Sequence, residues 1–392
     1  MQTFSFDIPV QSSISRARRG ILKTPHGTIQ TPAFVTVGTK ATVKALSPED
    51  LEKMKTQFIF ANTYHLVLSP GPDVIAAHGG IHAMSGIEKP MITDSGGFQV
   101  FSLSFPHRKN MYQLSDSAST VEDDETHPTL VKITNDGVTF RAHTDGTEYT
   151  FTPEFSIDAQ QKIGADFMVA FDECIYNGAT KKYTEQATHR THEWAVRSVK
   201  KAKSTCEIDG PQRVYGVIQG GRFQDLRTMS TEYIASLPVF GIGLGGVSVG
   251  EKNEELREEV EWIMDVLHSD PRPRHLLGIS TFDDVLYAVK QGLDTFDCIL
   301  PTRDARTGRL YVRVGEKDGV GIYDKINIRN AQWKSNIEPI NADSLGNVSY
   351  AYLHHLLKQR ELLYYRLATI HNLYMTEQFF KEIRQAIEDG KL

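Results

Sequence analysis

Two acidic residues, Asp94 and Asp297, stand where side chains of their type could carry out chemistry. Asp94 ends the apolar segment of MITDSGGFQVFSL at 91–103, directly before a serine and two glycines. Asp297 lies in FDCILPTR at 296–303, which runs straight into arginine. Two carboxylates with neighbouring cations suit a reaction at a sugar carbon attached to a phosphodiester backbone.

Each acid has a proposed role and an alternative. Asp297 suits a nucleophile that attacks an anomeric carbon and forms a covalent glycosyl–enzyme intermediate, with Arg303 and Arg306 gripping phosphates or base edges. Asp297 could instead be a buried structural acid paired with Arg303. Asp94 suits a general acid for the leaving group and then a general base for the incoming one. Its alternative is an N-capping aspartate in a tight turn.

A second set of residues suits recognition of a planar ring. Gly96-Gly97 allow close approach of the backbone, and Phe98 could stack on the ring. Asp172 could accept two hydrogen bonds from a guanine-like edge, while Gln219 and the backbone N–H near Gly246 could donate to a purine carbonyl oxygen. The glycines alone would equally suit a phosphate-binding or plain tight loop.

Basic and histidine residues elsewhere have weaker claims to function. The segment Lys181–Lys203 carries seven lysines and arginines and could face RNA, although a solvated helix face is the simpler interpretation. His354-His355 and His371 could bind a metal, although isolated histidines more often pack or face solvent.

The elements that must position these residues alternate between short apolar strands and amphipathic helices, which favours a (β/α)8 barrel or a doubly wound sheet. Strands are predicted at Thr31–Val37, Phe58–Asn62, Met91–Thr93, Phe167–Phe171, Arg213–Ile218, Gly241–Leu244, His275–Gly278 and Thr295–Leu300. Helices are predicted at Pro153–Ile163, Tyr183–Lys203, Asp225–Ser236, Glu254–Leu267 and Phe282–Gln291. No GxGxxG opens the first helix, and the polar residues follow the strands in turn, as on the catalytic face of a barrel. We therefore predict an α/β fold, a TIM (β/α)8 barrel.

Two regions interrupt or follow this alternation. A polar insertion at 104–137 leads into a predicted hairpin of Val138–His143 and Glu148–Thr152. From about residue 320 the pattern is helical, most clearly at Ser349–Gln359 and Met375–Glu388. We predict a catalytic domain over 1–310, with its insertion at about 104–152, and a small helical C-terminal subdomain over 311–392.

Composition sets the class of protein. The chain has 392 residues, a formal net charge of −6 and no apolar run long enough to span a membrane. Its N-terminus lacks a signal-peptide pattern, and its three cysteines form neither a CxxC nor an even set. These features predict a cytoplasmic protein that does not bind polyanions indiscriminately.

The motifs together resemble the tRNA-guanine transglycosylase family, also called queuine tRNA-ribosyltransferase. The resemblance rests on DSGGFQVFSL, FDEC, VIQGG, GIGLGGVSVGE, LLGIS, FDCILPTRDARTG, Asn62-Thr63-Tyr64-His65-Leu66 and ATIHN, in order from about residue 14 to 388. It implies a TIM-barrel pentosyltransferase that exchanges the wobble guanine, position 34, of GUN-anticodon tRNAs (Asp, Asn, His and Tyr) for a 7-deazaguanine, either preQ1 or queuine.

The resemblance also implies roles for individual residues. Asp297 matches the nucleophile and Asp94 the general acid/base. The predicted base-binding residues are Ser95, Gly96, Gly97, Phe98, Asp172, Gln219, Gly246 and Val247. The predicted tRNA-contacting residues are Gly278, Ile279, Ser280, Thr281, Phe282, Asp283, Asp284, Thr302, Arg303, Asp304, Ala305 and Arg306.

The chain departs from the family at the zinc site. Bacterial and eukaryotic members resemble one another in a CxCxxC motif with a downstream histidine, whereas Ile340–Ser349 contains no cysteine and only His371 matches. A structural zinc needs four donors, so we expect no zinc and no other cofactor, with an alternative Asp/His site left open.

The resemblance leaves the incoming base, the partners and the class of protein to be decided. Bacterial family members that use preQ1 resemble this chain in having a valine at the position of Val249 and a cysteine at the position of Cys174. This resemblance favours preQ1 over queuine. We expect a homodimer. The alternatives are a non-catalytic tRNA-binding accessory subunit, disfavoured because both Asp94 and Asp297 are present, and an archaeosine-type transglycosylase, disfavoured because such enzymes carry an additional C-terminal domain.

Overall fold

The computed structural model describes residues 4–97, 131–142, 146–205, 211–247, 253–279 and 281–392. Phe98, Ser280, Val249 and the predicted loop up to residue 130 lie outside these residues. In the described part of the chain, no helix combines the length and the apolar composition needed to cross a membrane.

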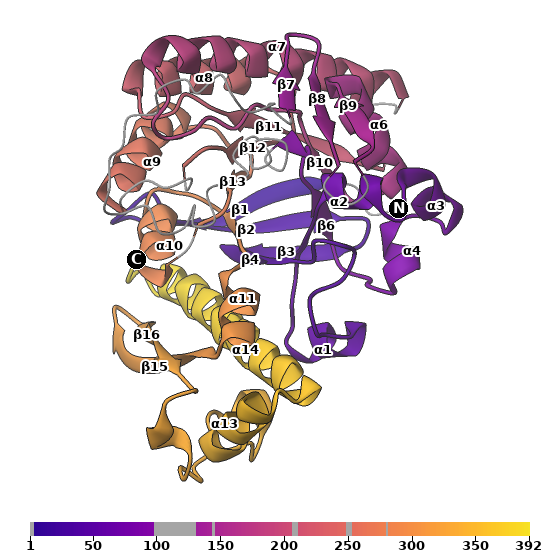
Figure 1. Ribbon diagram of the computed structural model, residues 1–392. Helices are drawn as coiled ribbons and strands as arrows, with labels where there is room; N and C mark the ends of the chain where they lie inside the picture. Colours follow the sequence, from indigo (N-terminus) through magenta and orange to yellow (C-terminus); the bar gives the residue numbers. More distant parts are fainter. Residues whose placement is uncertain (1–3, 98–130, 143–145, 206–210, 248–252, 280) are drawn as a thin grey trace. The chain divides into compact units, whose positions relative to one another are not determined.

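Eight parallel strands form a closed barrel, which confirms the predicted fold class (Figure 1). They are β4 (Ala33–Val37), β5 (Ile59–Ala61), β6 (Met91–Thr93), β10 (Phe167–Val169), β11 (Arg213–Ile218), β12 (Gly241–Leu244), β13 (Arg274–Leu276) and β14 (Thr295–Cys298). Nearly every residue of these strands is buried. Strands covered on both faces need continuous apolar runs, so this burial explains why all eight could be predicted.

Helices connect the barrel strands, and all five predicted helices are present. The helices up to residue 307 are α1 (Pro48–Lys53), α2 (Thr63–Leu68), α3 (Pro72–Ala77), α4 (Ile81–Ser85), α6 (Pro153–Ile163), α7 (Lys181–Thr205), α8 (Gln224–Ser236), α9 (Asn253–Leu267), α10 (Phe282–Lys290) and α11 (Leu300–Thr307). Several begin at side-chain caps, such as Thr152, which accepts a hydrogen bond from the Phe155 N–H, and Thr281, which accepts one from the Asp284 N–H.

The chain divides into two compact units. One comprises Met1–Phe60, Ser85–Pro90 and Gly278–Leu392, and the other comprises Ala61–Met84 and Met91–Leu277. This division differs from the predicted boundary at residue 310, which stays a prediction.

The first unit contains an N-terminal antiparallel sheet that the sequence analysis did not predict, formed by β1 (Ser5–Gln11), β2 (Arg18–Thr24) and β3 (Gly27–Thr31). A buried ion pair between Arg18 and Asp294 joins β2 to the residue before β14, with the Arg18 Nη2 2.6 Å from the carboxylate. Because both side chains are buried, each depends on the other for its charge compensation.

The C-terminal region of this unit corrects the purely helical prediction. Residues Arg309–Lys317 (β15) and Val320–Asn327 (β16) form an antiparallel hairpin before the helices begin. Its turn residues, Asp318 and Gly319, both have positive φ, as a tight two-residue hairpin turn requires. The Asp-Gly pair was therefore a hairpin signal that the helical interpretation overlooked.

The remaining elements of the first unit follow this hairpin. They are the 3₁₀ turn η1 (Ala331–Trp333), α12 (Ala342–Leu345), α13 (Tyr350–Gln359) and α14 (Leu362–Glu388). Leu310, Ile328, Leu353 and Tyr364 are buried together in their common core.

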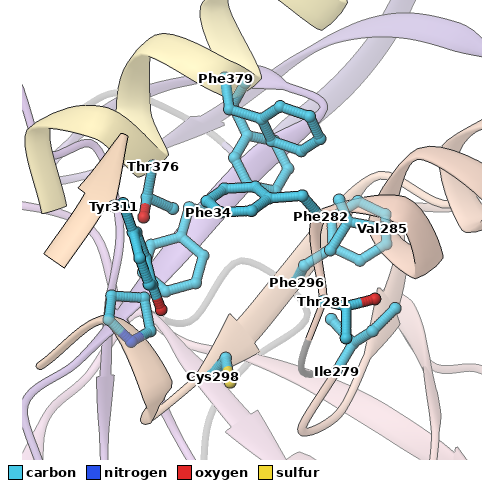
Figure 2. Close-up of a pocket in the computed structure, with 12 residues that line it drawn as sticks. Phe34, Ile279, Thr281, Phe282, Val285, Phe296, Cys298, Tyr311, Thr376 and Phe379 are labelled. Carbon is cyan, nitrogen blue, oxygen red and sulfur yellow. The ribbon is translucent and has the colours of Figure 1, made fainter. Parts of the chain in front are cut away.

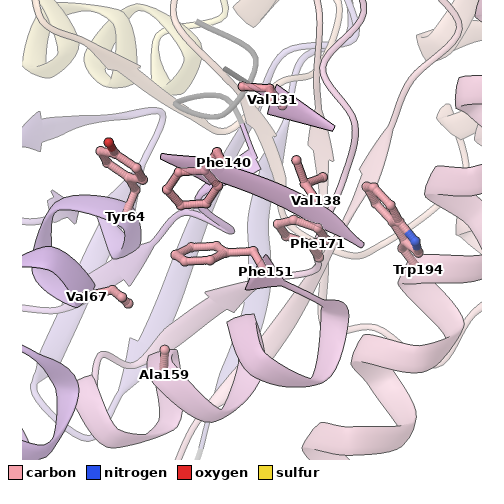
Figure 3. Close-up of a cluster of buried hydrophobic side chains, with 9 residues drawn as sticks. All are labelled: Tyr64, Val67, Val131, Val138, Phe140, Phe151, Ala159, Phe171 and Trp194. Carbon is pink, nitrogen blue, oxygen red and sulfur yellow. The ribbon is translucent and has the colours of Figure 1, made fainter. Parts of the chain in front are cut away.

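The second unit contains the predicted hairpin as part of a three-stranded antiparallel sheet. Its strands are β7 (Val131–Ile133), β8 (Val138–Arg141) and β9 (Glu148–Phe151). Figure 3 shows Phe140 and Phe151 of this sheet among Tyr64, Phe171 and Trp194, all of them buried. The insertion is thus anchored by aromatic packing within its own unit.

Candidate active site

Asp94 follows β6 directly and is held by the turn between β5 and α2. Its carboxylate accepts hydrogen bonds from the Thr63 N–H at 2.8 Å, the Gly96 N–H at 3.2 Å and the Asn62 side-chain amide. The hydrogen bond from Gly96 belongs to the tight turn that the alternative interpretation predicts. The donors Asn62 and Thr63, by contrast, follow the end of another barrel strand, β5. The three N–H donors bind the carboxylate oxygens and fix the orientation of the Asp94 side chain. Asp94 is half-buried, so its carboxylate is not sealed in the core.

Ser95 and the two glycines link this turn to Asp172. The Ser95 hydroxyl donates to Asp172 Oδ1 at 2.7 Å and accepts from the Gly97 N–H at 3.1 Å. A Cβ at Gly97 would overlap the Asp172 carbonyl oxygen, so only glycine fits there. Gly96 has a φ of +84°, which also favours glycine. The glycines thus allow two strand ends to approach closely.

Asp172 and Gln219 form a polar pair at the ends of β10 and β11. The Gln219 Nε2 donates to Asp172 Oδ2 at 2.9 Å, so both carboxylate oxygens already accept a hydrogen bond. Burial raises the pKa of Asp172 above its usual value, and the charge of Glu173 acts in the same direction, while the bonds from Ser95 and Gln219 oppose this rise. The site therefore holds a carboxylate whose ionised form is costly.

Glu173, next to Asp172, fixes this loop. Its carboxylate pairs with Arg190 and accepts a hydrogen bond from the Tyr183 hydroxyl at 2.6 Å. Its backbone N–H donates to the Thr191 hydroxyl at 3.1 Å. All three partners lie on α7, so this helix holds the Asp172 loop in place.

Gly245 and Gly246 follow β12 and lie against Gln219. A Cβ at Gly245 would lie 2.6 Å from Gln219 Nε2, and one at Gly246 would lie 2.7 Å from Gln219 Oε1. That Oε1 atom is buried and has no hydrogen-bond partner among the described residues. Val247 is fully buried. Both glycines are needed because any side chain would displace Gln219.

Asp297 lies within β14, paired in parallel register with Val35 of β4. It is half-buried, and its Oδ1 accepts a hydrogen bond from the Gly278 N–H at 3.1 Å. Gly278 has a φ of +77°. Partial exposure argues against the alternative of a buried structural acid and leaves the carboxylate accessible to a substrate.

The predicted tRNA-contacting segments divide into buried and accessible side chains. Ile279, Asp284, Thr302, Asp304 and Ala305 are buried. Asp284 accepts a hydrogen bond from the Thr281 hydroxyl at 2.5 Å at the start of α10. These side chains therefore have structural partners, and any contact with RNA from these residues would involve their backbone.

Phe282 and Ile279 line an apolar cavity of about 30 Å³, shown in Figure 2 with Phe34, Tyr311 and Phe379. The Phe282 ring lies edge-on to Tyr311, with ring centroids 5.2 Å apart, and also packs against Phe379. The cavity belongs to the packing around α10 and α14, and its lining offers few polar groups for a ligand.

Arg303, Arg306 and Asp283 remain accessible in these segments, with the two arginines half-buried. Arg306 donates to the Thr302 carbonyl at 2.8 Å, and burial together with the charge of Arg303 holds the pKa of Arg306 below its ordinary value. Two arginines on one short helix form a local positive patch of the kind that binds phosphate.

The cations of α7 are largely paired within the protein. Arg197 forms a two-pronged ion pair with Glu154, Lys181 lies 2.6 Å from Asp225, and Lys201 lies 3.2 Å from Asp158. This pairing favours the solvated helix face over an RNA-binding stripe.

In the region of the family zinc site, the histidines contact groups of the protein. His371 is buried, its Nε2 lies 2.7 Å from the Tyr311 carbonyl, and its Nδ1 lies 3.1 Å from the Ser344 hydroxyl. Burial lowers the pKa of His371 to about 4, so the ring is neutral at pH 7. Because Nε2 donates to the Tyr311 carbonyl, the lone pair of the neutral ring is on Nδ1, which faces the Ser344 hydroxyl. His354 is likewise bonded, with its Nδ1 2.8 Å from the Ile328 carbonyl.

Comparisons with known proteins show the family of the chain. The family model described as queuine tRNA-ribosyltransferase matches residues 13–392. The chain belongs to this family. It is similar to the queuine tRNA-ribosyltransferase of Herpetosiphon aurantiacus, at 41% identity over 98% of this chain and 89% of that protein. It is also similar to those of Caldanaerobacter subterraneus (38%, covering 100% and 96%) and Thioalkalivibrio sulfidiphilus (40%, covering 96% and 92%).

Family membership makes the chain a pentosyltransferase of tRNA modification, a tRNA-guanine transglycosylase in the queuosine pathway, as the motifs predicted. The roles of individual residues are not decided by this match.

Sequence reasoning missed several residues that build the site. Asn62 and Thr63, which hold Asp94, follow the apolar run of β5, so the rule that polar residues after strands face the site could have found them. Tyr183 and Arg190, which hold Glu173, lie on α7, 10 and 17 residues further along the chain, and no local pattern marks them.

Proposed function

We propose that this enzyme exchanges guanine 34 of GUN-anticodon tRNAs for the queuosine precursor preQ1, through a covalent ribosyl–Asp297 intermediate. The observation that carries the proposal is the polar cluster of Asp172, Gln219 and Gly246, which complements the hydrogen-bonding edge of a guanine-type base. The half-buried carboxylates of Asp94 and Asp297 at strand ends support the chemistry.

In the first step, a carboxylate oxygen of Asp297 attacks C1′ of the ribose, and the C1′–N9 bond breaks. Asp94, in its acid form, gives its proton to the departing guanine, so the base leaves neutral. The ribose is then joined to Asp297 through an ester bond.

In the second step, N9 of the incoming base attacks the same C1′, and the ester bond breaks. The electron pair returns to the Asp297 carboxylate, and Asp94 takes the N9 proton. Asp94 is thereby ready to act as acid in the next cycle. Every bond and proton is accounted for without a metal, a cofactor or ATP.

The base would bind by replacing hydrogen bonds that the protein now makes within itself. The base N1–H and 2-amino group would donate to the Asp172 oxygens that now accept from Ser95 and Gln219. Gln219 would then be free to turn its amide and donate to the 6-oxo group beside the Gly246 N–H.

The choice of preQ1 as the incoming base is based on the glycine loop that follows β12. Val249 and Glu251 lie outside the described residues, so this argument rests on sequence. A valine at this position would leave room for an aminomethyl group but clash with the ring of queuine. The Val247 carbonyl would accept a hydrogen bond from the ammonium group of preQ1. Glu251 would balance the charge of that group. We also propose tRNA as the macromolecular partner, the cytoplasm as the location and a homodimer as the active form.

An exchange assay tests this proposal. Transfer RNA with radiolabelled guanine at position 34 should lose its label when the enzyme and preQ1 are added. Queuine should exchange more slowly, and Val249→Gly should shift the preference towards queuine. Faster exchange with queuine in the wild type would contradict the choice of preQ1, while retention of the label with both bases would contradict the proposed activity.

A further inference from the structure

Arg227 of α8 is fully buried and binds three backbone carbonyls of the loops around the candidate base site. Its Nε donates to Gly221 O at 2.8 Å, its Nη1 to Gly245 O at 2.6 Å and its Nη2 to Gly246 O at 2.8 Å. The Nη2 also lies 2.8 Å from the carboxylate of Glu259 on α9, and the two side chains are 0% and 1% exposed. All of these residues belong to the second compact unit.

This arrangement fixes the direction of one particular N–H group. In a planar trans peptide the C=O and N–H bonds point in opposite directions. The Gly245 carbonyl points at the Arg227 guanidinium, so the Gly246 N–H of the same peptide unit must point away from it. The Gly246 N–H is the proposed donor to the 6-oxo group of the base.

Glycine makes such a restraint necessary. No side chain fits at Gly245 or Gly246, because a Cβ would displace the Gln219 amide. Two adjacent glycines leave the peptide between them free to rotate. Arg227 supplies from α8 the restraint that the loop's own side chains cannot provide.

The same helix also holds Gln219, the other donor of the site. The Gln219 backbone N–H donates to the Ser230 hydroxyl at 3.2 Å, and that hydroxyl lies 3.0 Å from His192 Nε2. Burial lowers the pKa of His192 to about 4, so its neutral ring can accept the Ser230 proton. One helix thus positions both groups that face the 6-oxo position.

A buried ion pair is a weak source of stability, because desolvation of the two charges offsets their attraction. Replacing Arg227 and Glu259 together by apolar residues of similar volume therefore leaves no buried charge uncompensated. The hydrogen bonds to the glycine carbonyls would be lost with them.

We propose that Arg227, held by Glu259, is a positioning residue that aims the Gly246 N–H at the 6-oxo group and so makes the enzyme selective for 6-oxopurines. The inference rests on the proposed function of the site and adds a residue that determines specificity. Arg227 itself is buried behind the loop and is assigned no contact with the base.

The test compares guanine with 6-thioguanine, which keeps N1–H and the 2-amino group but offers a weaker acceptor at position 6. The variant Arg227→Met/Glu259→Met removes the pair. Its KM for guanine should rise by about tenfold or more, because one buried hydrogen bond is misplaced. The KM for 6-thioguanine should rise clearly less, and the KM for tRNA should stay near the wild-type value.

Two further variants separate positioning from structural support. Arg197→Met/Glu154→Met removes a two-pronged ion pair between α7 and α6 in the same unit and should leave both base KM values unchanged. Arg227→Lys keeps the charge beside Glu259 but cannot bind three carbonyls at once. It should therefore lose guanine preference as well, whereas a purely structural ion pair would be restored by lysine.

An unchanged ratio of guanine to 6-thioguanine KM in Arg227→Lys would overturn the inference, and this variant decides if the double variant does not fold. Equal losses for both bases, as we expect for Asp172→Asn, would also overturn it. Failure of the wild type to exchange any base would reject the proposed function itself, which is a different result.

Discussion

Asp172 places a carboxyl group in surroundings that disfavour its charged form. Burial raises the pKa of its carboxyl, and the hydrogen bonds from Ser95 and Gln219 offset only part of this effect. A residue selected for stability alone would not be an acid here. The proposed role explains the cost, because only an ionised carboxylate can accept two hydrogen bonds from a guanine-type base.

Asp172→Asn should therefore separate binding of the base from stability. The native pKa of Asp172 is above its unfolded value, so ionisation destabilises the fold as pH rises through that window. Removing the charge should leave the melting temperature at pH 7 unchanged or slightly higher. The KM for guanine should rise by about tenfold or more, since a donor now faces the base's donors. Equal losses in tRNA affinity and base affinity would contradict this role.

The same pKa predicts how recognition depends on pH. Because the ionised form binds the base, guanine binding by the wild type should weaken as pH falls through the raised pKa of Asp172. The loss should thus begin at a higher pH than the usual aspartate value of about 3.9. Asp172→Asn should lack this dependence in its residual binding, which gives the control.

At the scale of elements, helix α11 is held by a buried acid. Asp304 is 2.9 Å from Lys325 of β16 and 3.4 Å from the Tyr311 hydroxyl of β15. Arg303 and Arg306, the accessible arginines, lie on the same helix. The β15–β16 hairpin therefore sets the position of the proposed tRNA-binding arginines.

Asp304→Asn should raise the KM for tRNA several-fold and leave the KM for the base unchanged. It should cost about 1–2 kcal/mol of stability, because Lys325 is partly exposed and its charge is screened. Lys23→Gln, which breaks the exposed pair between Lys23 and Asp7 in the N-terminal sheet of the same unit, serves as the control and should change neither value. A loss of base affinity equal to the loss of tRNA affinity would contradict the assignment.

The C-terminal elements also predict the metal content. His371 uses both ring nitrogens within the protein, and Ser344 lies where the segment lacks a cysteine. Metal analysis of the purified protein should find well under one zinc per chain, and a chelator should leave the melting temperature unchanged. Stoichiometric zinc with a melt that the chelator lowers would show that the side chains rearrange to bind it.

The elements differ in how readily sequence predicts them. The eight barrel strands are buried on both faces and therefore read as continuous apolar runs. The N-terminal strand Ser5–Gln11 has no fully buried position, so its sequence lacks that signal. The carboxylates of the site were found because polar residues after strands are conspicuous. Arg227 and Glu259 lie within helices, and only the folded structure reveals that they meet.

At the scale of the whole molecule, the family match covers residues 13–392, and the residues given roles lie within it, between Asp94 and Arg306. Asp94 belongs to one compact unit and Asp297 to the other. The mechanism assigns the two acids different work: Asp297 forms the bond to ribose, and Asp94 only moves protons. That difference can be observed directly.

The most direct test is to trap the intermediate. Wild-type enzyme incubated with tRNA and a poorly displacing base should form a covalent RNA–protein adduct that survives a denaturing gel. Asp297→Ala should form none while melting near the wild-type temperature. Asp94→Asn should form the same adduct more slowly, because the nucleophile remains but the departing guanine lacks its proton donor. Complete loss of the adduct in Asp297→Ala, with only slower formation in Asp94→Asn, is the result we predict. An adduct that persists in Asp297→Ala would contradict the central claim, because the nucleophile would then be another residue.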